Sequence, residues 1–62
     1  MEFNVGDKVI FGAYGDFNNE TEVWTITQKD KCDKFLGGIQ YHLENDKGSS
    51  VVAFADEVKP AN

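Results

Sequence analysis

Residues 3–11 read Phe-Asn-Val-Gly-Asp-Lys-Val-Ile-Phe, and this stretch decides how the rest of the chain is interpreted. Gly6 and Asp7 are typical of a turn, because glycine tolerates positive φ and aspartate bonds to nearby backbone groups. The valine, isoleucine and phenylalanine side chains fit a pleated, half-buried surface and therefore favour a strand. A strand this short needs at least two neighbours to bury an apolar face. The sequence therefore predicts an opening β-strand that pairs with strands further along the chain.

Two segments follow this stretch, a loop and a second predicted strand. Residues 12–19 read Gly-Ala-Tyr-Gly-Asp-Phe-Asn-Asn, and the glycines and asparagines break any regular period, so a loop is expected there. Residues 21–28 are β-branched and aromatic, with Trp24 and Ile26 on one face, and predict the second strand. Val23 interrupts the alternation, either as a bulge or as an apolar residue on the outer face.

The middle of the chain predicts a hairpin. Residues 29–34 alternate in charge and lead to the glycine pair 37–38, a pattern that indicates an exposed connection. Residues 39–44 alternate strictly between apolar and polar side chains and predict a third strand. The Asn-Asp-Lys-Gly sequence at 45–48 is a tight turn, and the valine-rich residues 49–54 form the returning strand.

The last segment, residues 55–60, ends at a proline, which suits a sheet edge because proline cannot donate to the ladder. We expect one short helical turn near Asp56 and then a short final strand. The fold class is therefore all-β, a single five-stranded domain over residues 1–62. The residues predicted to point inward and form one apolar core are Val9, Phe11, Trp24, Ile26, Tyr41, Leu43 and Val58.

The charge balance indicates which partners to expect. Six basic and eleven acidic residues give a formal net charge of -5, so long-range electrostatics repel a phosphate backbone. All six basic residues are lysines, and arginine supplies most bidentate contacts to bases and phosphates. Nucleic acid is therefore not an expected partner, whereas a cationic surface is favoured.

Catalytic chemistry has few candidate residues in this chain. His42 is the only histidine and Cys32 the only cysteine, which is too few for a zinc site or an intramolecular disulfide. We interpret His42 as a surface strand residue and Cys32, which lies among lysines, as an incidental rather than a reactive thiol. The chain is therefore expected to be no enzyme and to hold no cofactor. Its single cysteine, and the lack of a signal peptide or membrane-spanning stretch, favour a cytoplasmic location.

The order of these segments resembles the small barrels of the Src homology 3-like superfold. The resemblance covers nearly the whole chain and rests on the Gly-Asp before the first strand, the Asp-Lys-Gly turn and the closing Ala-Asp-Glu-Val-Lys-Pro. Within that superfold the chain looks closest to Tudor-like and bacterial KOW-like barrels. Its size and acidity are also similar to those of small proteins encoded by bacteriophages and prophages. The resemblance implies a five-stranded barrel that presents a binding surface.

The candidate binding residues are aromatic and acidic and centre on the loop at 12–19. Aromatic rings either fill the core of so small a barrel or gather at its mouth to bind a cation. We predict a protein partner bound through Tyr14, Asp16, Phe17 and Trp24. The function expected is a small protein-binding module. The alternatives are a KOW-like nucleic-acid accessory domain and an acidic phage-type inhibitor that mimics nucleic acid.

Overall fold

The computed structural model describes residues 3–18, 21–32 and 38–61, which form an all-β domain. These residues contain five strands, with a short 3-10 turn in two of the connections, and the predicted fold class is confirmed. In chain order the elements are β1 (Lys8–Phe11), η1 (Ala13–Gly15), β2 (Val23–Cys32), β3 (Gly38–Glu44), β4 (Ser50–Phe54), η2 (Ala55–Glu57) and β5 (Val58–Pro60). The turn η2 is the one expected near Asp56, and η1 adds a second within the predicted loop. No helix in the described ranges is long and apolar enough to cross a membrane.

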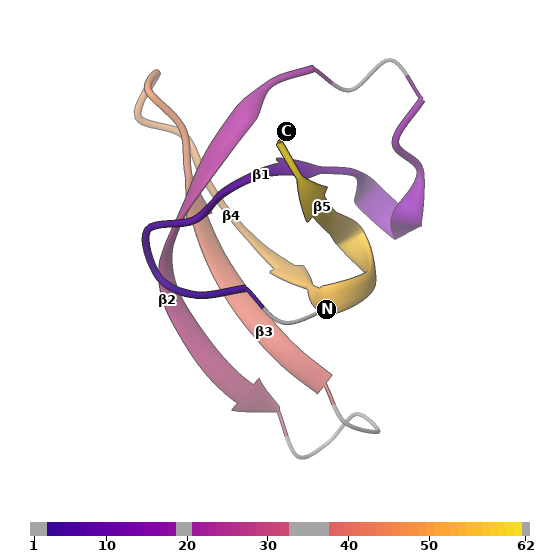
Figure 1. The fold of residues 1–62 in the computed structure, drawn as a ribbon, viewed down its shortest axis with the longest axis vertical. Coiled ribbons are helices and arrows are strands. Elements are labelled where there is room, and N and C mark those ends of the chain that lie inside the picture. Colours follow the sequence, from indigo (N-terminus) through magenta and orange to yellow (C-terminus); the bar gives the residue numbers. More distant parts are fainter. Residues whose placement is uncertain (1–2, 19–20, 33–37, 62) are drawn as a thin grey trace.

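The strands form one antiparallel sheet in the order β4-β3-β2-β1-β5. The long strand β2 joins the two halves: Val23–Thr25 pair with β1, whereas Thr25–Cys32 pair with β3. A register shift between Ile26 and Gln28 interrupts β2 where these two pairings meet. Bulges of this kind bend a strand and increase its twist. The sheet consequently curls into a barrel-like shape without closing, and β4 and β5 are its edges (Figure 1).

The opening strand is shorter than the sequence predicts, because residues 3–7 form a turn rather than a strand. The Asp7 amide donates to the Asn4 carbonyl, and the Asn4 amide donates to the Asp7 side chain. Gly6 has a φ of 96°, a conformation that glycine adopts at little steric cost. Gly6 and Asp7 also exchange backbone hydrogen bonds with Ile26, so the predicted turn is anchored to β2.

The second strand is longer than predicted, and the exposed connection expected at 29–34 is wrong for its first four residues. Residues Lys29 to Cys32 pair with β3 from Tyr41 to Gly38. Alternating charges leave backbone groups free to complete a ladder, so charge alone did not mark the end of the strand. The remainder of that connection, and Gly37, lie outside the described residues. Val23 is 45% exposed, so it interrupts the alternation as an apolar residue on the outer face.

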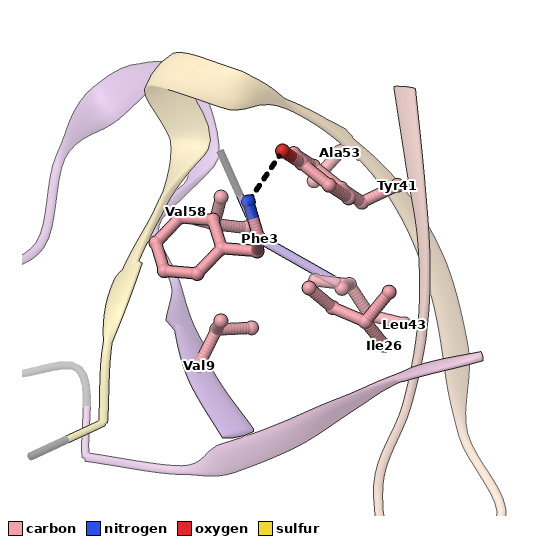
Figure 2. Close-up of a cluster of buried hydrophobic side chains, with 7 residues drawn as sticks. All are labelled: Phe3, Val9, Ile26, Tyr41, Leu43, Ala53 and Val58. Atoms are coloured by element: carbon pink, nitrogen blue, oxygen red, sulfur yellow. Dashed lines mark hydrogen bonds between the residues drawn. The ribbon is translucent and has the colours of Figure 1, made fainter. Parts of the chain in front are cut away.

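Most of the predicted core is buried, and two unpredicted residues join it. The predicted residues that are buried are Val9, Ile26, Tyr41, Leu43 and Val58. Phe11 and Trp24 are half-buried and pack against this cluster from its rim. Phe3 and Ala53 complete it, and Figure 2 shows the side chains converging from opposite sides of the curled sheet.

The buried Tyr41 hydroxyl secures the N-terminal segment to this core. It accepts a hydrogen bond from the Phe3 amide over 3.0 Å, and the two rings meet edge to face at 5.9 Å (Figure 2). A buried hydroxyl without a partner is costly. The bond therefore explains how a polar atom is accommodated in the core and why Phe3, outside any strand, is buried.

Candidate functional site

The segment from Gly12 to Asn18, here called the aromatic loop, has a defined conformation set by short-range hydrogen bonds. The Gly15 amide donates to the Gly12 carbonyl and the Asp16 amide to the Ala13 carbonyl, both over 3.0 Å. The Asp16 side chain accepts a hydrogen bond from the Asn18 amide, which is the turn that aspartate favours. These bonds make the loop a compact structural unit between β1 and β2.

Tyr14 lies at the tip of η1 and is the most unusual residue of the loop. Its side chain is 98% exposed, so it gains almost nothing from burial. Its backbone is left-handed, with φ 58° and ψ 23°, and it is the one non-glycine residue at positive φ in the described ranges. This conformation costs an L-residue roughly 1–2 kcal/mol. Tyr14 thus has a backbone conformation that costs free energy and an aromatic ring that is almost fully exposed to solvent.

Glu57 holds Tyr14 in this conformation. One carboxylate oxygen, Oε2, accepts from the Tyr14 amide over 2.9 Å, and the other, Oε1, accepts from the Phe54 amide over 3.0 Å. The Glu57 carbonyl in addition accepts from the Gly12 amide over 2.8 Å. Glu57 of η2 therefore binds the residue before η1 and the middle residue of η1, which explains why the two turns lie side by side in Figure 1.

Gly12 is required because the loop folds back tightly on itself. A Cβ atom at this position would lie 2.5 Å from the Asp16 carbonyl oxygen and 2.7 Å from a ring carbon of Phe17. Neither distance is compatible with a side chain, and the nearer atom belongs to the backbone. Gly12 therefore permits the close approach that brings Asp16 and Phe17 back against the end of β1.

The other predicted loop residues have different environments. Asp16 is exposed, whereas Phe17 is half-buried. The Lys59 amine lies over the Phe17 ring, 5.1 Å from its centroid, in a cation–π contact. Phe17 thus contacts β5, and the Lys59 amine covers part of one face of its ring.

Trp24 makes contacts with strand β1. It pairs with Val9 across β1 and β2, and its ring meets Phe11 edge to face at 6.2 Å. Tyr41, which was predicted to be a core residue, is fully buried and is not available to an aromatic cluster that binds a cation. Because the Tyr14 ring is almost entirely solvated, the described residues assemble no cage around it. The four predicted binding residues are therefore one solvated ring, one exposed acid and two partly buried rings.

A second polar group, missed from the sequence, lies on the outer face of β2 and β3. His42 Nε2 is 2.9 Å from Asp30 Oδ2, and the side-chain amide of Gln28 donates from Nε2 to the same oxygen over 2.9 Å. The sequence placed Asp30 in a connection, which separated it from His42. A period of two continued from Trp24 and Ile26 would have put Asp30 on the inner face, and the register shift between Ile26 and Gln28 is what places it on the outer face with His42. Within the described ranges no three His, Cys, Asp or Glu residues are placed to hold a metal ion.

The aromatic loop is therefore the candidate site, with Tyr14 as its solvated tip and Glu57 as the residue that fixes it. Comparison with known proteins adds no relative to this geometry: no protein-family model, no curated protein and no solved structure matches the chain.

Proposed function

We propose that this chain is a small non-enzymatic protein-binding module, and that Tyr14 at the tip of the aromatic loop is its principal contact residue. The proposal includes a Src homology 3-like barrel of the Tudor-like or KOW-like kind as the scaffold. Support for that part comes from the five-stranded antiparallel sheet and from the 3-10 turn that precedes the last strand.

The observation that carries the proposal is the conformation and exposure of Tyr14. Residues in sparsely populated backbone regions persist when the surrounding structure holds them there, and they are concentrated at functional sites. Here the Glu57 carboxylate supplies that constraint, and the ring it projects is 98% exposed. Tyrosine is enriched among the residues that dominate interface energetics, because it buries a large area at low entropic cost. A partner would provide the burial that the isolated domain does not.

The surroundings of Tyr14 favour a partner with basic groups. Asp16 and Asp56 are both exposed. The backbone carbonyl of Asp56 lies close to Gly15, the residue after Tyr14: a Cβ atom at Gly15 would be 3.5 Å from it. The net charge of -5 adds a long-range attraction for cationic surfaces. The partner proposed is therefore a protein with an apolar pocket for the Tyr14 ring and basic residues at its rim.

Site-specific photo-crosslinking tests this function. The photoreactive phenylalanine analogue benzoylphenylalanine replaces Tyr14 in one variant and Val23 in the other. The Val23 variant is the control, because Val23 is an apolar residue outside the loop and is 45% exposed. We expect a discrete crosslinked protein from the variant labelled at position 14 and none from the control. Equal crosslinking at both positions, or none at position 14, would contradict the proposal. Adding excess duplex DNA distinguishes a nucleic-acid mimic, whose crosslink the DNA would suppress.

A further inference from the structure

The edge strand β4 has less protection against pairing than the other edge of the sheet. Its five residues, Ser50 to Phe54, include no charge and no proline. The opposite edge, β5, has only three residues and contains Lys59 and Pro60, both of which discourage pairing at an edge. Within the described sheet β4 is therefore the less protected edge, although the Phe54 amide at its end is bonded to Glu57.

The direction of the backbone groups on β4 follows from two independent hydrogen bonds. The His42 carbonyl accepts from the Thr27 hydroxyl of β2, so His42 directs its backbone toward β2. Alternate residues of a strand direct their N–H and C=O groups to opposite neighbours. Val52, which is paired with His42, therefore points its N–H and C=O away from β3. The Phe54 amide bonds to Glu57 rather than to β3, which gives the same alternation two residues further along.

The side chains next to this edge are apolar and exposed. Val52 is 44% exposed and Phe54 36%, and both lie on the outer face of the sheet, where the register pairs them with His42 and Gln40. We propose that β4 pairs antiparallel with β4 of a second copy of this chain, about a two-fold axis at Val52. This interface is separate from the aromatic loop and does not depend on the proposed function.

A second copy is favoured because the strand is complementary to itself. With the axis at Val52, the two Val52 residues exchange both of their backbone hydrogen bonds, and Ser50 of each copy lies opposite Phe54 of the other. The Phe54 amide remains bonded to Glu57 and donates no hydrogen bond across the interface. No like charges face one another within the paired segment. The valine and phenylalanine side chains of both copies form one patch across the axis. Beyond the strand, this register directs the exposed Lys47 of each copy toward the turn that contains Asp56, although Asp46 beside Lys47 reduces that attraction.

The small size of the contact predicts weak association. Five residues span about 17 Å of strand, and such a pair buries well under the roughly 1,200 Å² of a stable interface. Dimerisation should therefore depend on concentration, with a dissociation constant on the order of 100 µM.

Sedimentation equilibrium of the full chain from about 10 µM to about 1 mM, a range that brackets weak interfaces, tests this inference. The variants are Val52→Lys, which places two lysines at the axis, and Val23→Lys, a control of nearly equal exposure at 45% on the central strand β2. Both substitutions change the net charge equally, so long-range repulsion is matched. We expect the wild type and Val23→Lys to dimerise as concentration rises, and Val52→Lys to bind itself at least tenfold more weakly.

A second measurement reports on the backbone. Hydrogen exchange of the Val52 amide should slow as wild-type concentration rises, because the dimer bonds that N–H. A wild-type chain that remains monomeric throughout the range would overturn the inference. The β4 edge would then pair, if at all, with an extended segment of another protein. Equal dimerisation of Val52→Lys and Val23→Lys, with each shown by circular dichroism to be folded, would overturn it as well.

Discussion

Replacement of Glu57 is the perturbation that separates the aromatic loop from the rest of the fold. Its carboxylate accepts from the Tyr14 and Phe54 amides over 2.9 and 3.0 Å, and the side chain is half-buried. Hydrogen bonds to charged groups contribute about 1.5–3 kcal/mol each when well buried, and partial exposure reduces this to about 1 kcal/mol each. Glu57→Ala should therefore lower the free energy of unfolding by about 2 kcal/mol, and Glu57→Gln, which keeps one carbonyl oxygen, by about 1 kcal/mol.

Urea denaturation measures these losses, and hydrogen exchange of the Tyr14 amide locates them. In Glu57→Ala the Tyr14 amide should exchange at the rate of an unprotected amide, while the buried strands retain their protection. The matched control is Asp56→Ala, which removes a carboxylate of the same turn that is exposed. If Glu57→Ala and Asp56→Ala lose the same stability within about 0.5 kcal/mol, the typical effect of a surface substitution, Glu57 does not hold the loop.

Three further predictions concern the core, the backbone of Tyr14 and nucleic acid. Leu43→Ala should cost about 2–5 kcal/mol in a denaturant melt, because Leu43 is 1% exposed, and a loss below about 0.5 kcal/mol would place its side chain outside the core. Tyr14→Gly should be about 1 kcal/mol more stable than Tyr14→Ala, since only glycine relieves a left-handed backbone, and equal stability would show that position 14 is unstrained. Fluorescence anisotropy with labelled single-stranded and duplex DNA should show no binding near physiological salt at a net charge of -5, whereas micromolar, salt-sensitive binding would favour the KOW-like alternative.

The strands and most of the core could be predicted because both depend on a period of two. Ile26, Tyr41 and Leu43 alternate with polar residues, and the structure buries all three. Phe3 could not be identified in this way, because a long-range bond to the Tyr41 hydroxyl, and not a local pattern, holds it in the core. The strand character of residues 29–32 was missed for a related reason, since pairing with β3 and not side-chain polarity decides it.

The turn at residues 45–48 was predicted, but its internal bonding was not. Asn45 is buried, and its side-chain oxygen accepts from the amides of Lys47 and Ser49, while its side-chain amide donates to Glu22. The sequence identifies asparagine as a turn residue but gives no sign of a contact with a glutamate before β2. Distant partners of this kind appear only once the strands are placed.

The candidate site was predictable in part. Tyr14 and Phe17 were both candidate binding residues because they lie in a predicted loop, but the structure exposes the Tyr14 ring and half-buries Phe17. The left-handed backbone of Tyr14 and the role of Glu57 were not predictable, because the two residues are 43 positions apart in the sequence. Trp24 differs from Tyr14 already in the sequence, because it lies in a predicted strand, whereas Phe17 lies in the same loop as Tyr14 and is distinguished by its contact with Lys59.

The central claim is that the Tyr14 ring serves binding and not folding, and one paired measurement on Tyr14→Ala tests it most directly. Thermal unfolding and affinity capture from the native host are compared for the wild type, for Tyr14→Ala and for Val23→Ala, the control with 45% exposure. We predict that Tyr14→Ala keeps its stability within about 0.5 kcal/mol, as a solvated side chain should, and loses the captured partner, while Val23→Ala retains it. Undiminished capture by a folded Tyr14→Ala protein, or its unfolding, would contradict the claim.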